Sequence, residues 1–163
     1  MCHEMLEHML SRAEFLATLH RRRLAAGALI RDAAGRICLV EPTYKETWHL
    51  PGGTVETDES PAGGCHRELV EELGLDMPIG PMLIMDWISP SDGDPHGALM
   101  FVYDGGVLDQ ADIDQIVTPP DELRGYRFVA EAELGLYITE RNQSRIRAAL
   151  SALGGPVVEL NRD

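Results

Sequence analysis

Residues 53–75 most constrain how this 163-residue chain folds, because they combine a glycine-led loop with the start and end signals of one helix. Pro61 suits the first turn of a helix, where its missing N–H is not needed. No further proline follows before Gly74, which is a natural C-cap. The segment therefore predicts a helix over residues 61–73, of about three to four turns.

The predicted helix places acidic side chains together. At about 100° per residue, Glu68, Glu71 and Glu72 lie within one arc of roughly 100°, while Leu69 and Leu73 fall on a neighbouring face that can pack inward. Like charges at these spacings repel by about a few tenths of a kcal/mol, so a divalent cation would offset a real cost. The all-oxygen ligand set favours Mg²⁺ or Mn²⁺ over zinc. The alternative is a solvated acidic helix face.

The spacing of the whole segment is more specific than its helix. It reads G-x5-E-x7-R-E-U-x-E-E-x-G-U, where U is an apolar residue, and the letters WHLPG precede it. A chance match of the seven fixed residues at a given start has a probability of about one in a billion. The pattern resembles the complete box of the Nudix hydrolases, and the preceding letters are similar to that family's usual lead-in. The resemblance implies an α/β fold, with an α/β/α sandwich around a mixed β-sheet, and hydrolysis of phosphoric anhydride bonds.

The resemblance also implies roles for individual residues. The metal ligands would be the three glutamates of the helix and the carbonyl of Gly52, since adjacent glycines allow the backbone to approach a ligand closely. Arg67 would make an orienting contact with carboxylates of the box, and Glu59 is its candidate partner. The residues expected to act structurally within the box are Gly53, Glu59 and Gly74.

Hydrolysis of a P–O–P linkage also calls for a base that takes a proton from the attacking water. In similar enzymes, this base is either the glutamate after the box arginine or a glutamate on a distant loop. The first is Glu68 here. The candidate for the second is Glu122, just before the last predicted strand, with an ordinary surface acid as the alternative interpretation. Magnesium is the expected ion, with manganese as a substitute.

The composition fits a small enzyme that handles a phosphate substrate through metal ions. The chain has 27 acidic and 14 basic residues and a formal net charge of −13. This balance disfavours partners such as nucleic acids and anionic membranes. The three cysteines show no C-x2-C spacing, and no signal peptide or membrane-spanning apolar run is found. We therefore expect a cytoplasmic protein whose partner is a small-molecule nucleotide.

The N-terminal segment has helical periodicity. Its apolar residues recur at Leu6, Met9, Leu10, Ala13, Leu16 and Ala17. They predict an amphipathic helix over residues 3–20, followed by three arginines at 21–23. We interpret the arginines as a solvated helix end that complements the helix dipole, with a phosphate- or partner-binding patch as the alternative. The expected organisation is this helix within residues 1–22, a Nudix domain at 23–155 and a tail at 156–163; whether the helix makes a homodimer stays open.

Five apolar runs predict the strands of the sheet. Residues 24–30 and 36–41 flank a turn and read as an antiparallel pair. Residues 82–88 and 98–103 form a second pair, and 124–129 a last strand. A closing helix is expected over residues 137–153. Strands flanked by helices again favour an α/β/α sandwich.

Substrate recognition is expected outside the box, on loops that border the metal site. Loops 42–47 and 89–97 are the candidates, with contacts from Tyr44, Lys45, Trp87 and His96. Pro90 lies 15 residues past Leu75, which resembles the proline position of ADP-ribose pyrophosphatases. We therefore expect a Mg²⁺-dependent pyrophosphohydrolase acting on a nucleotide sugar or ADP-ribose-like compound, or on a nucleoside triphosphate. The alternative is a non-catalytic Nudix-fold ligand sensor, which the intact glutamates disfavour.

Overall fold

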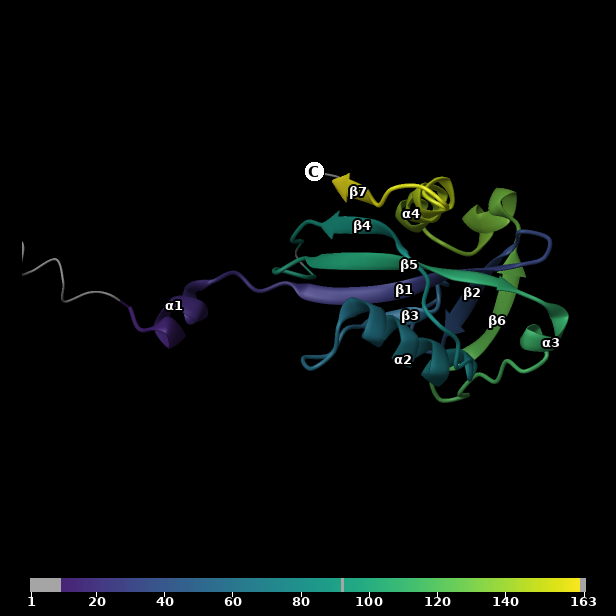
Figure 1. Ribbon diagram of the computed structural model, residues 1–163, viewed down its shortest axis with the longest axis horizontal. Coiled ribbons are helices and arrows are strands. Elements are labelled where there is room, and N and C mark those ends of the chain that lie inside the picture. The colour runs from purple at the N-terminus through teal and green to yellow at the C-terminus, as the bar shows by residue number, and fades with distance from the viewer. Residues whose placement is uncertain (1–9, 92, 162–163) are drawn as a thin grey trace, which may run out of the picture.

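The computed structural model describes residues 10–91 and 93–161, which build a seven-stranded mixed sheet between helices (Figure 1). The strands are β1 (Arg23–Asp32), β2 (Ile37–Pro42), β3 (Gly52–Thr54), β4 (Met82–Ile88), β5 (Ala98–Leu108), β6 (Leu123–Val129) and β7 (Val158–Asn161). The helices are α1 (Arg12–Thr18), α2 (Pro61–Leu73), α3 (Gln110–Ile113), the 3-10 helix η1 (Glu131–Leu136) and α4 (Glu140–Ser151). The strand order is β6-β2-β1-β5-β4-β7, and β3 pairs with β1 outside this path.

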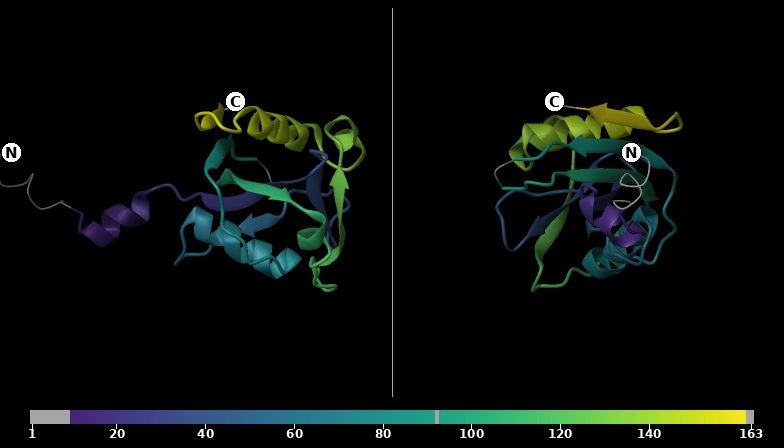
Figure 2. Two further views of the ribbon diagram at one scale, coloured as in Figure 1. Left: turned by 45° about the vertical axis from the view of Figure 1, so that its right-hand side comes forward. Right: turned by 90° about the vertical axis from the view of Figure 1, so that its left-hand side faces the viewer.

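The two faces of the sheet are covered by different helices. α2 lies on one face and α4 on the other, as both views of Figure 2 show. Alternate residues of β1 supply the two cores, because successive side chains of a strand point to opposite faces. Ala26, Ala28 and Ile30 join the α2 side, whereas Leu29 joins the α4 side. The expected α/β/α sandwich around a mixed sheet is confirmed.

The helix predicted over residues 61–73 is present with these bounds. The side chain of Ser60 caps it by accepting a hydrogen bond from the backbone of Gly63, and Pro61 occupies the first turn. Gly74 ends it in the left-handed region, at φ 69°. Leu69 and Leu73 are fully buried against the sheet. This burial fixes the rotation of the helix about its own axis, so that Glu68 and Glu72 face β3.

The other predicted elements are present with shifted ends. The hairpin of β1 and β2 is antiparallel, as expected, and β5 continues to Leu108, past the predicted end of its strand. α4 begins at Glu140, capped by the side chain of Thr139, which is later than the predicted helix start at residue 137. The C-terminal residues expected as a tail instead contain β7, which pairs in parallel with β4. Its four residues are too short for a clear alternation in the sequence.

The N-terminal helix differs from its prediction. Residues 3–9 of the predicted helix lie outside the described residues; within them, α1 begins after the capping residue Ser11 and ends at Thr18. It lies apart from the sheet and its covering helices (Figures 1 and 2). The arginines at 21–23 therefore do not end a helix, because Leu19 is already extended. Leu16 and Phe15 of α1 are about half exposed, at 46% and 50%.

Candidate functional site

Arg67 organises the acidic residues at the exposed side of α2. Its guanidinium makes two hydrogen bonds to the carboxylate of Glu59, of 2.8 and 3.1 Å, so the contact expected for this pair is present. It also donates to Glu68 at 3.0 Å, to Glu71 at 2.8 Å and to the carbonyl of Thr54 at 3.0 Å. These bonds, with the Glu59 contact first, raise the pKa of Arg67. The same contact lowers the pKa of Glu59.

Glu72 is the most buried of the three helix glutamates, with 6% of its surface exposed. Its carboxylate accepts a hydrogen bond of 2.7 Å from the backbone N–H of Gly52. Burial, with the charges of Glu68 and Glu122 adding to it, raises the pKa of Glu72 to about 8, even though the Gly52 hydrogen bond and the charge of Lys45 act in the opposite direction. Burial likewise raises the pKa of Glu68. Two partly desolvated carboxylates thus lie close together, with Arg67 bound to Glu68 and the charge of Lys45 acting on Glu72.

The loop before α2 brings the backbone against these carboxylates. Gly52 has a φ of 139°, and a side chain there would collide with the backbone of Ala26 in β1. A side chain at Gly53 would collide with the carboxylate of Glu68. Both positions therefore require glycine, and the requirement comes from the close approach of β3 to β1 and α2.

The donor set fits a hard divalent cation, although the carboxylates do not converge on one point. Within residues 10–91 and 93–161, no three His, Cys, Asp or Glu side chains are close enough together to hold a metal ion. The three carboxylates point to different partners: Glu68 and Glu71 bind Arg67, whereas Glu72 binds the backbone of Gly52. The oxygens of the three glutamates suit Mg²⁺ or Mn²⁺. A cation would offset the cost of burying the Glu68 and Glu72 carboxylates and the repulsion between them.

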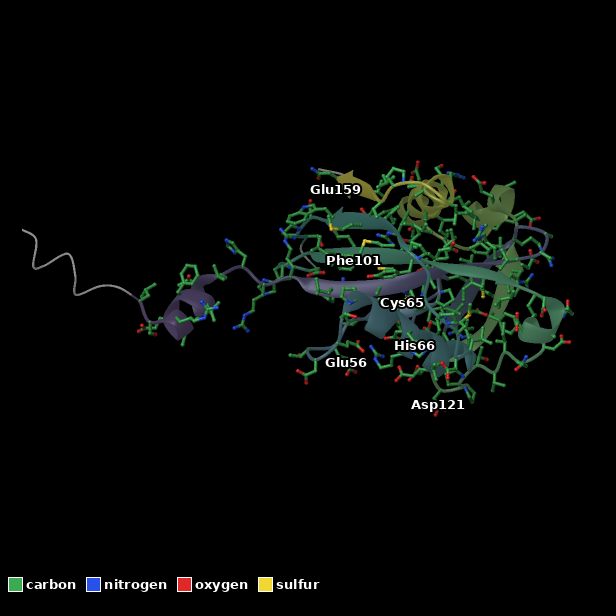
Figure 3. All side chains as sticks on the ribbon, viewed as in Figure 1. Glu56, Cys65, His66, Phe101, Asp121 and Glu159 are labelled. Carbon is green, nitrogen blue, oxygen red and sulfur yellow. The ribbon has the colours of Figure 1, made fainter. Side chains whose placement is uncertain are left out.

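Glu122 lies in the connection between α3 and β6, which passes the C-terminal end of α2. The N–H of Val117 in this connection donates to the carbonyl of Leu73 at 3.0 Å. Figure 3 labels Asp121, the neighbour of Glu122, below α2. The Glu122 carboxylate is close enough to raise the pKa of both Glu68 and Glu72. The structure therefore brings together the two residues that the sequence offered as alternative bases.

A cleft of about 330 Å³ adjoins the acidic residues at β3. Its lining combines backbone glycines, apolar side chains and a few polar ones: Arg23, Ala25, Tyr44, Lys45, His49, Leu50, Gly52, Gly53, Thr54, Ile88, Met100, Ile138, Asn142, Arg145 and Ile146. Tyr44 and Lys45, which the sequence offered as candidates for substrate contact, both line this cleft. The loop that carries them is tied to the Glu122 connection by a hydrogen bond of 2.8 Å from the N–H of Thr43 to the carbonyl of Glu122.

Trp87 and His96 are not among the cleft-lining residues in the part of the chain that the structure describes. The ring of Trp87 is covered by the guanidinium of Arg22, 3.6 Å from its centre. Arg22 also donates to the carbonyl of Ile88 at 3.3 Å, and Arg23 pairs with Asp94 at 3.2 Å. The arginines at 22 and 23 therefore contact the end of β4 and the loop that follows it.

The polar cleft residues that were not anticipated from the sequence include His49, Asn142 and Arg145. Arg145 forms a pair with the fully buried Asp86 of β4, with N–O distances of 2.8 and 2.7 Å. One sequence signal was available, because Asp86 interrupts the apolar run MLIMDWI. A charged residue inside a buried strand requires a partner. The sequence alone did not say that the partner lies on α4.

His49 is held as a neutral ring. Its Nδ1 donates to the carbonyl of Leu50 at 2.8 Å, which leaves Nε2 unprotonated. Burial, together with the nearby charge of Lys45, lowers the pKa of His49 to about 4. Among the described residues, Nε2 is buried without a hydrogen-bond partner.

The cysteines do not belong to this site. Cys38 and Cys65 are free and buried in the core on the α2 side, as expected for small apolar packing. Burial raises the pKa of the Cys65 thiol to about 12, so it stays protonated. Cys2 lies outside the described residues. Over residues 10–91 and 93–161, no helix has the length and apolar character to cross a membrane.

Comparisons with known proteins agree with this fold. A MutT-like protein of Streptomyces ambofaciens is 42% identical over 50 residues, which are 31% of this chain and 32% of that protein. The matched segments span about a third of the length of the curated relatives. The solved MutT protein of Methanosarcina mazei Go1 has a TM-score of 0.66 at 24% identity and covers 82% of this chain and 97% of its own.

A bifunctional NMN adenylyltransferase/ADP-ribose pyrophosphatase of Francisella tularensis, solved with AMP and a manganese ion, also shares the fold. Its TM-score is 0.66 at 18% identity, over 86% of this chain and 44% of its own. The model of the NUDIX domain matches residues 21–150. With the box on α2, the sandwich and this match in agreement, the chain belongs to the Nudix family.

Proposed function

We propose that this protein is a Mg²⁺-dependent pyrophosphohydrolase that cleaves a diphosphate linkage in a nucleotide. The observation that supports this most is the pair of partly desolvated glutamates, Glu68 and Glu72, on α2 beside the backbone of Gly52 and next to the cleft. Buried like charges are costly unless a cation neutralises them. A cation there would be placed to meet phosphate oxygens of a ligand in the cleft.

Each part of the site has one task in this proposal. Glu68, Glu71, Glu72 and the carbonyl of Gly52 hold Mg²⁺, which when bound neutralises phosphate oxygens and activates water for attack. Arg67 keeps the carboxylates of Glu68 and Glu71 oriented, and is itself fixed by two bonds to Glu59. The core packing of Leu69 and Leu73 holds the helix in place. The helix backbone that carries the proposed ligands is thereby fixed before a cation or a substrate binds.

The base in this proposal is Glu122. Glu68 is less suited, because Arg67 donates to it at 3.0 Å and it belongs to the proposed metal ligands. The charge of Glu122 acts on Glu68 and Glu72, so its carboxylate is near the proposed metal position. A carboxylate that is within reach of the site but outside the ligand set can accept the proton of the attacking water.

The remainder of the substrate would occupy the cleft, with Tyr44 and Lys45 at the side of the proposed metal site. Lys45 lies close enough to Glu72 for their charges to interact. Its ammonium would therefore face a phosphate group held at the same place. The experiment is release of phosphate or nucleoside monophosphate from a panel of nucleoside triphosphates, nucleotide sugars and ADP-ribose, with Mg²⁺ and with EDTA.

Variants in the box make this experiment specific. Glu72→Gln and Glu71→Gln should each remove most Mg²⁺-dependent turnover, while Glu133→Gln, an exposed glutamate of η1, should not change it. Glu72→Gln should melt at the same temperature as the wild type or slightly above it, because it removes a buried charge and keeps an acceptor for Gly52. Binding of nucleotides without any turnover would instead support a ligand sensor.

A further inference from the structure

Residues 10–22 form an arm that extends away from the body of the molecule, which is built by residues 23–161. Every residue of the arm from 10 to 21 is exposed, and α1 buries none of its side chains. Figure 1 shows α1 clear of the sheet and of the helices that cover it. A helix of seven residues is marginal in water, because most helical stability in proteins comes from packing of an apolar face. We therefore looked for the surface against which α1 packs.

The root of the arm is fixed to the body by two arginines. The guanidinium of Arg22 lies over the ring of Trp87, 3.6 Å from its centre, and donates to the carbonyl of Ile88 at 3.3 Å. The side chain of Arg23 pairs with Asp94 at 3.2 Å. The four residues between α1 and β1 can span at most about 14 Å. The helix therefore stays beside the end of the body at which its root is held.

One face of α1 combines apolar and basic character. At about 100° per residue, Arg12, Phe15 and Leu16 lie within an arc of roughly 100°, and Glu14 lies on the opposite side of the helix. Phe15 and Leu16 are about half exposed, and so is Leu19 directly after the helix. Apolar side chains that are exposed together on one face mark an interaction site. The surface that covers this face should be apolar in part and carry acidic side chains at its rim.

The body of the same chain has the matching charge. The arm contains three arginines and one glutamate, a formal charge of +2, whereas residues 23–163 contain 11 basic and 24 acidic residues, a formal charge of −13. Figure 3 shows Glu56 and Glu159, both of them exposed, at the end of the body from which the arm projects. In a two-fold pair of copies, the arm of each copy meets this end of the other body. An anionic membrane would attract the arm but repel the body.

We propose that the arm docks on a second copy of this chain, so that the protein is a two-fold dimer held by its arms. The apolar faces of the two α1 helices pack together, and Arg12 and Arg21 of each copy face Glu56 and Glu159 of the other. Each contact is made twice, because a two-fold interface pairs the same surfaces of both copies. The inference uses neither the cleft nor the glutamates of α2, so it is independent of the proposed function.

The first test is the mass of the full-length protein in solution, by sedimentation equilibrium over a range of micromolar concentrations. We expect a dimer, with twice the chain mass of 18.0 kDa. Phe15→Gln/Leu16→Gln should raise the dissociation constant of the dimer at least about tenfold, because the apolar contact is lost on both copies. The matched control is Leu136→Gln/Val157→Gln, which replaces two exposed apolar side chains of the body and should leave the dissociation constant unchanged.

The second test reverses charges on the arm and on the body separately, at low ionic strength, where surface charges are least screened. Arg12→Glu/Arg21→Glu and Glu56→Arg/Glu159→Arg should each weaken the dimer at least about tenfold, because like charges then face each other across the interface. An equal mixture of the two variants should dimerise again, since each copy then meets the opposite charge on the other. Recovery on mixing also shows that both variants are folded.

The other outcomes would overturn the inference. A wild type that is monomeric at every concentration would exclude the dimer, and a dimer that persists in Phe15→Gln/Leu16→Gln would place the interface elsewhere. Charge-reversed variants that stay monomeric when mixed would show that the arm and the acids of the second copy do not meet. A monomer that sediments with vesicles of phosphatidylserine and phosphatidylcholine through Phe15 and Leu16 would identify a lipid surface as the partner. Glu72→Gln should dimerise as the wild type does, so failure of the proposed hydrolase is a separate result.

Discussion

At the scale of single residues, the proposed chemistry depends on carboxylates that differ in their surroundings. Glu72 is nearly buried, Glu71 is half exposed, and Glu122 approaches them from a separate connection. The same side-chain type can therefore act as ligand or as base, according to position. This difference gives a direct test of the proposed base.

Glu122→Gln should lower kcat by about 10²-fold or more with little change in KM, because general-base contributions are of this size. Glu68→Gln should instead lower kcat and also raise the Mg²⁺ concentration needed for half-maximal rate, since it would lose a ligand. Steady-state kinetics at several Mg²⁺ concentrations separates the two. A Glu122→Gln enzyme with a normal kcat would exclude Glu122 as the base.

Asp32, the last residue of β1, is a carboxylate outside the proposed site whose role is structural. Burial alone would raise its pKa, but hydrogen bonds from the backbone and side chain of Arg36 and from the N–H of Ala34 outweigh burial and lower it. A lowered pKa adds stability above the unfolded value of about 3.9, and this stability is lost as pH falls through the folded value.

We therefore expect Asp32→Asn to reduce the free energy of unfolding by about 1–2 kcal/mol at pH 7. The deficit should be unchanged at pH 5 and should shrink at pH values below about 3.9. Urea unfolding at several pH values measures it, with the exposed Asp58→Asn as control. A deficit that stayed constant down to pH 3 would show that the charge of Asp32 does not contribute.

At the scale of elements, the ends of α2 matter most. Where the helix starts and how it is rotated determine where the glutamates of the box lie. Its C-terminus depends on Gly74 in the left-handed region, at φ 69°, where the nearest atom to an added Cβ is 3.6 Å away. An alanine there would meet no clash, so its cost is conformational.

Gly74→Ala should lower stability by about 1–2 kcal/mol, and the melting temperature by about 2–8 °C. Gly155→Ala is a matched control, because Gly155 has no positive φ and an added Cβ would be 3.6 Å from the nearest atom. Thermal melts of both variants in EDTA make the comparison without any metal effect. Equal melting temperatures would mean that the end of α2 does not require the left-handed conformation.

At the scale of the whole molecule, a formal charge of −13 opposes compaction, and the acidic site adds to the repulsion. Binding of Mg²⁺ to the folded state alone should raise the melting temperature, by an amount equivalent to about 2.7 kcal/mol when Mg²⁺ is at 100 times its Kd. The variant Glu71→Gln/Glu72→Gln should show little of this rise.

Sodium chloride at matched ionic strength is the control for this measurement, because general screening stabilises both proteins equally. The difference between the melting temperatures in Mg²⁺ and in sodium chloride then measures binding of Mg²⁺ at the proposed site. An equal Mg²⁺ effect on wild type and double variant would place the ions elsewhere on the acidic surface.

The sequence determined the elements whose signals are local. The bounds of α2 follow from Pro61 and Gly74, and the spacing of the glutamates along it follows from helix geometry. The layers of the fold follow from the alternation of strands and helices. The close contact of Glu59 with Arg67 was also predictable, because both lie within the box.

The tertiary structure decided whatever depends on segments distant in the chain. Asp86 and Arg145 are separated by 59 positions and meet because β4 and α4 pack together. Trp87, one of the candidates for substrate contact, is covered by Arg22 from the segment before β1, and no signal in the sequence indicated this contact. Glu122 reaches α2 only because its connection docks against Leu73. Short-range spacing encodes a helix and the positions of the glutamates along it, whereas the composition of a cleft depends on which distant side chains the sheet brings to one place.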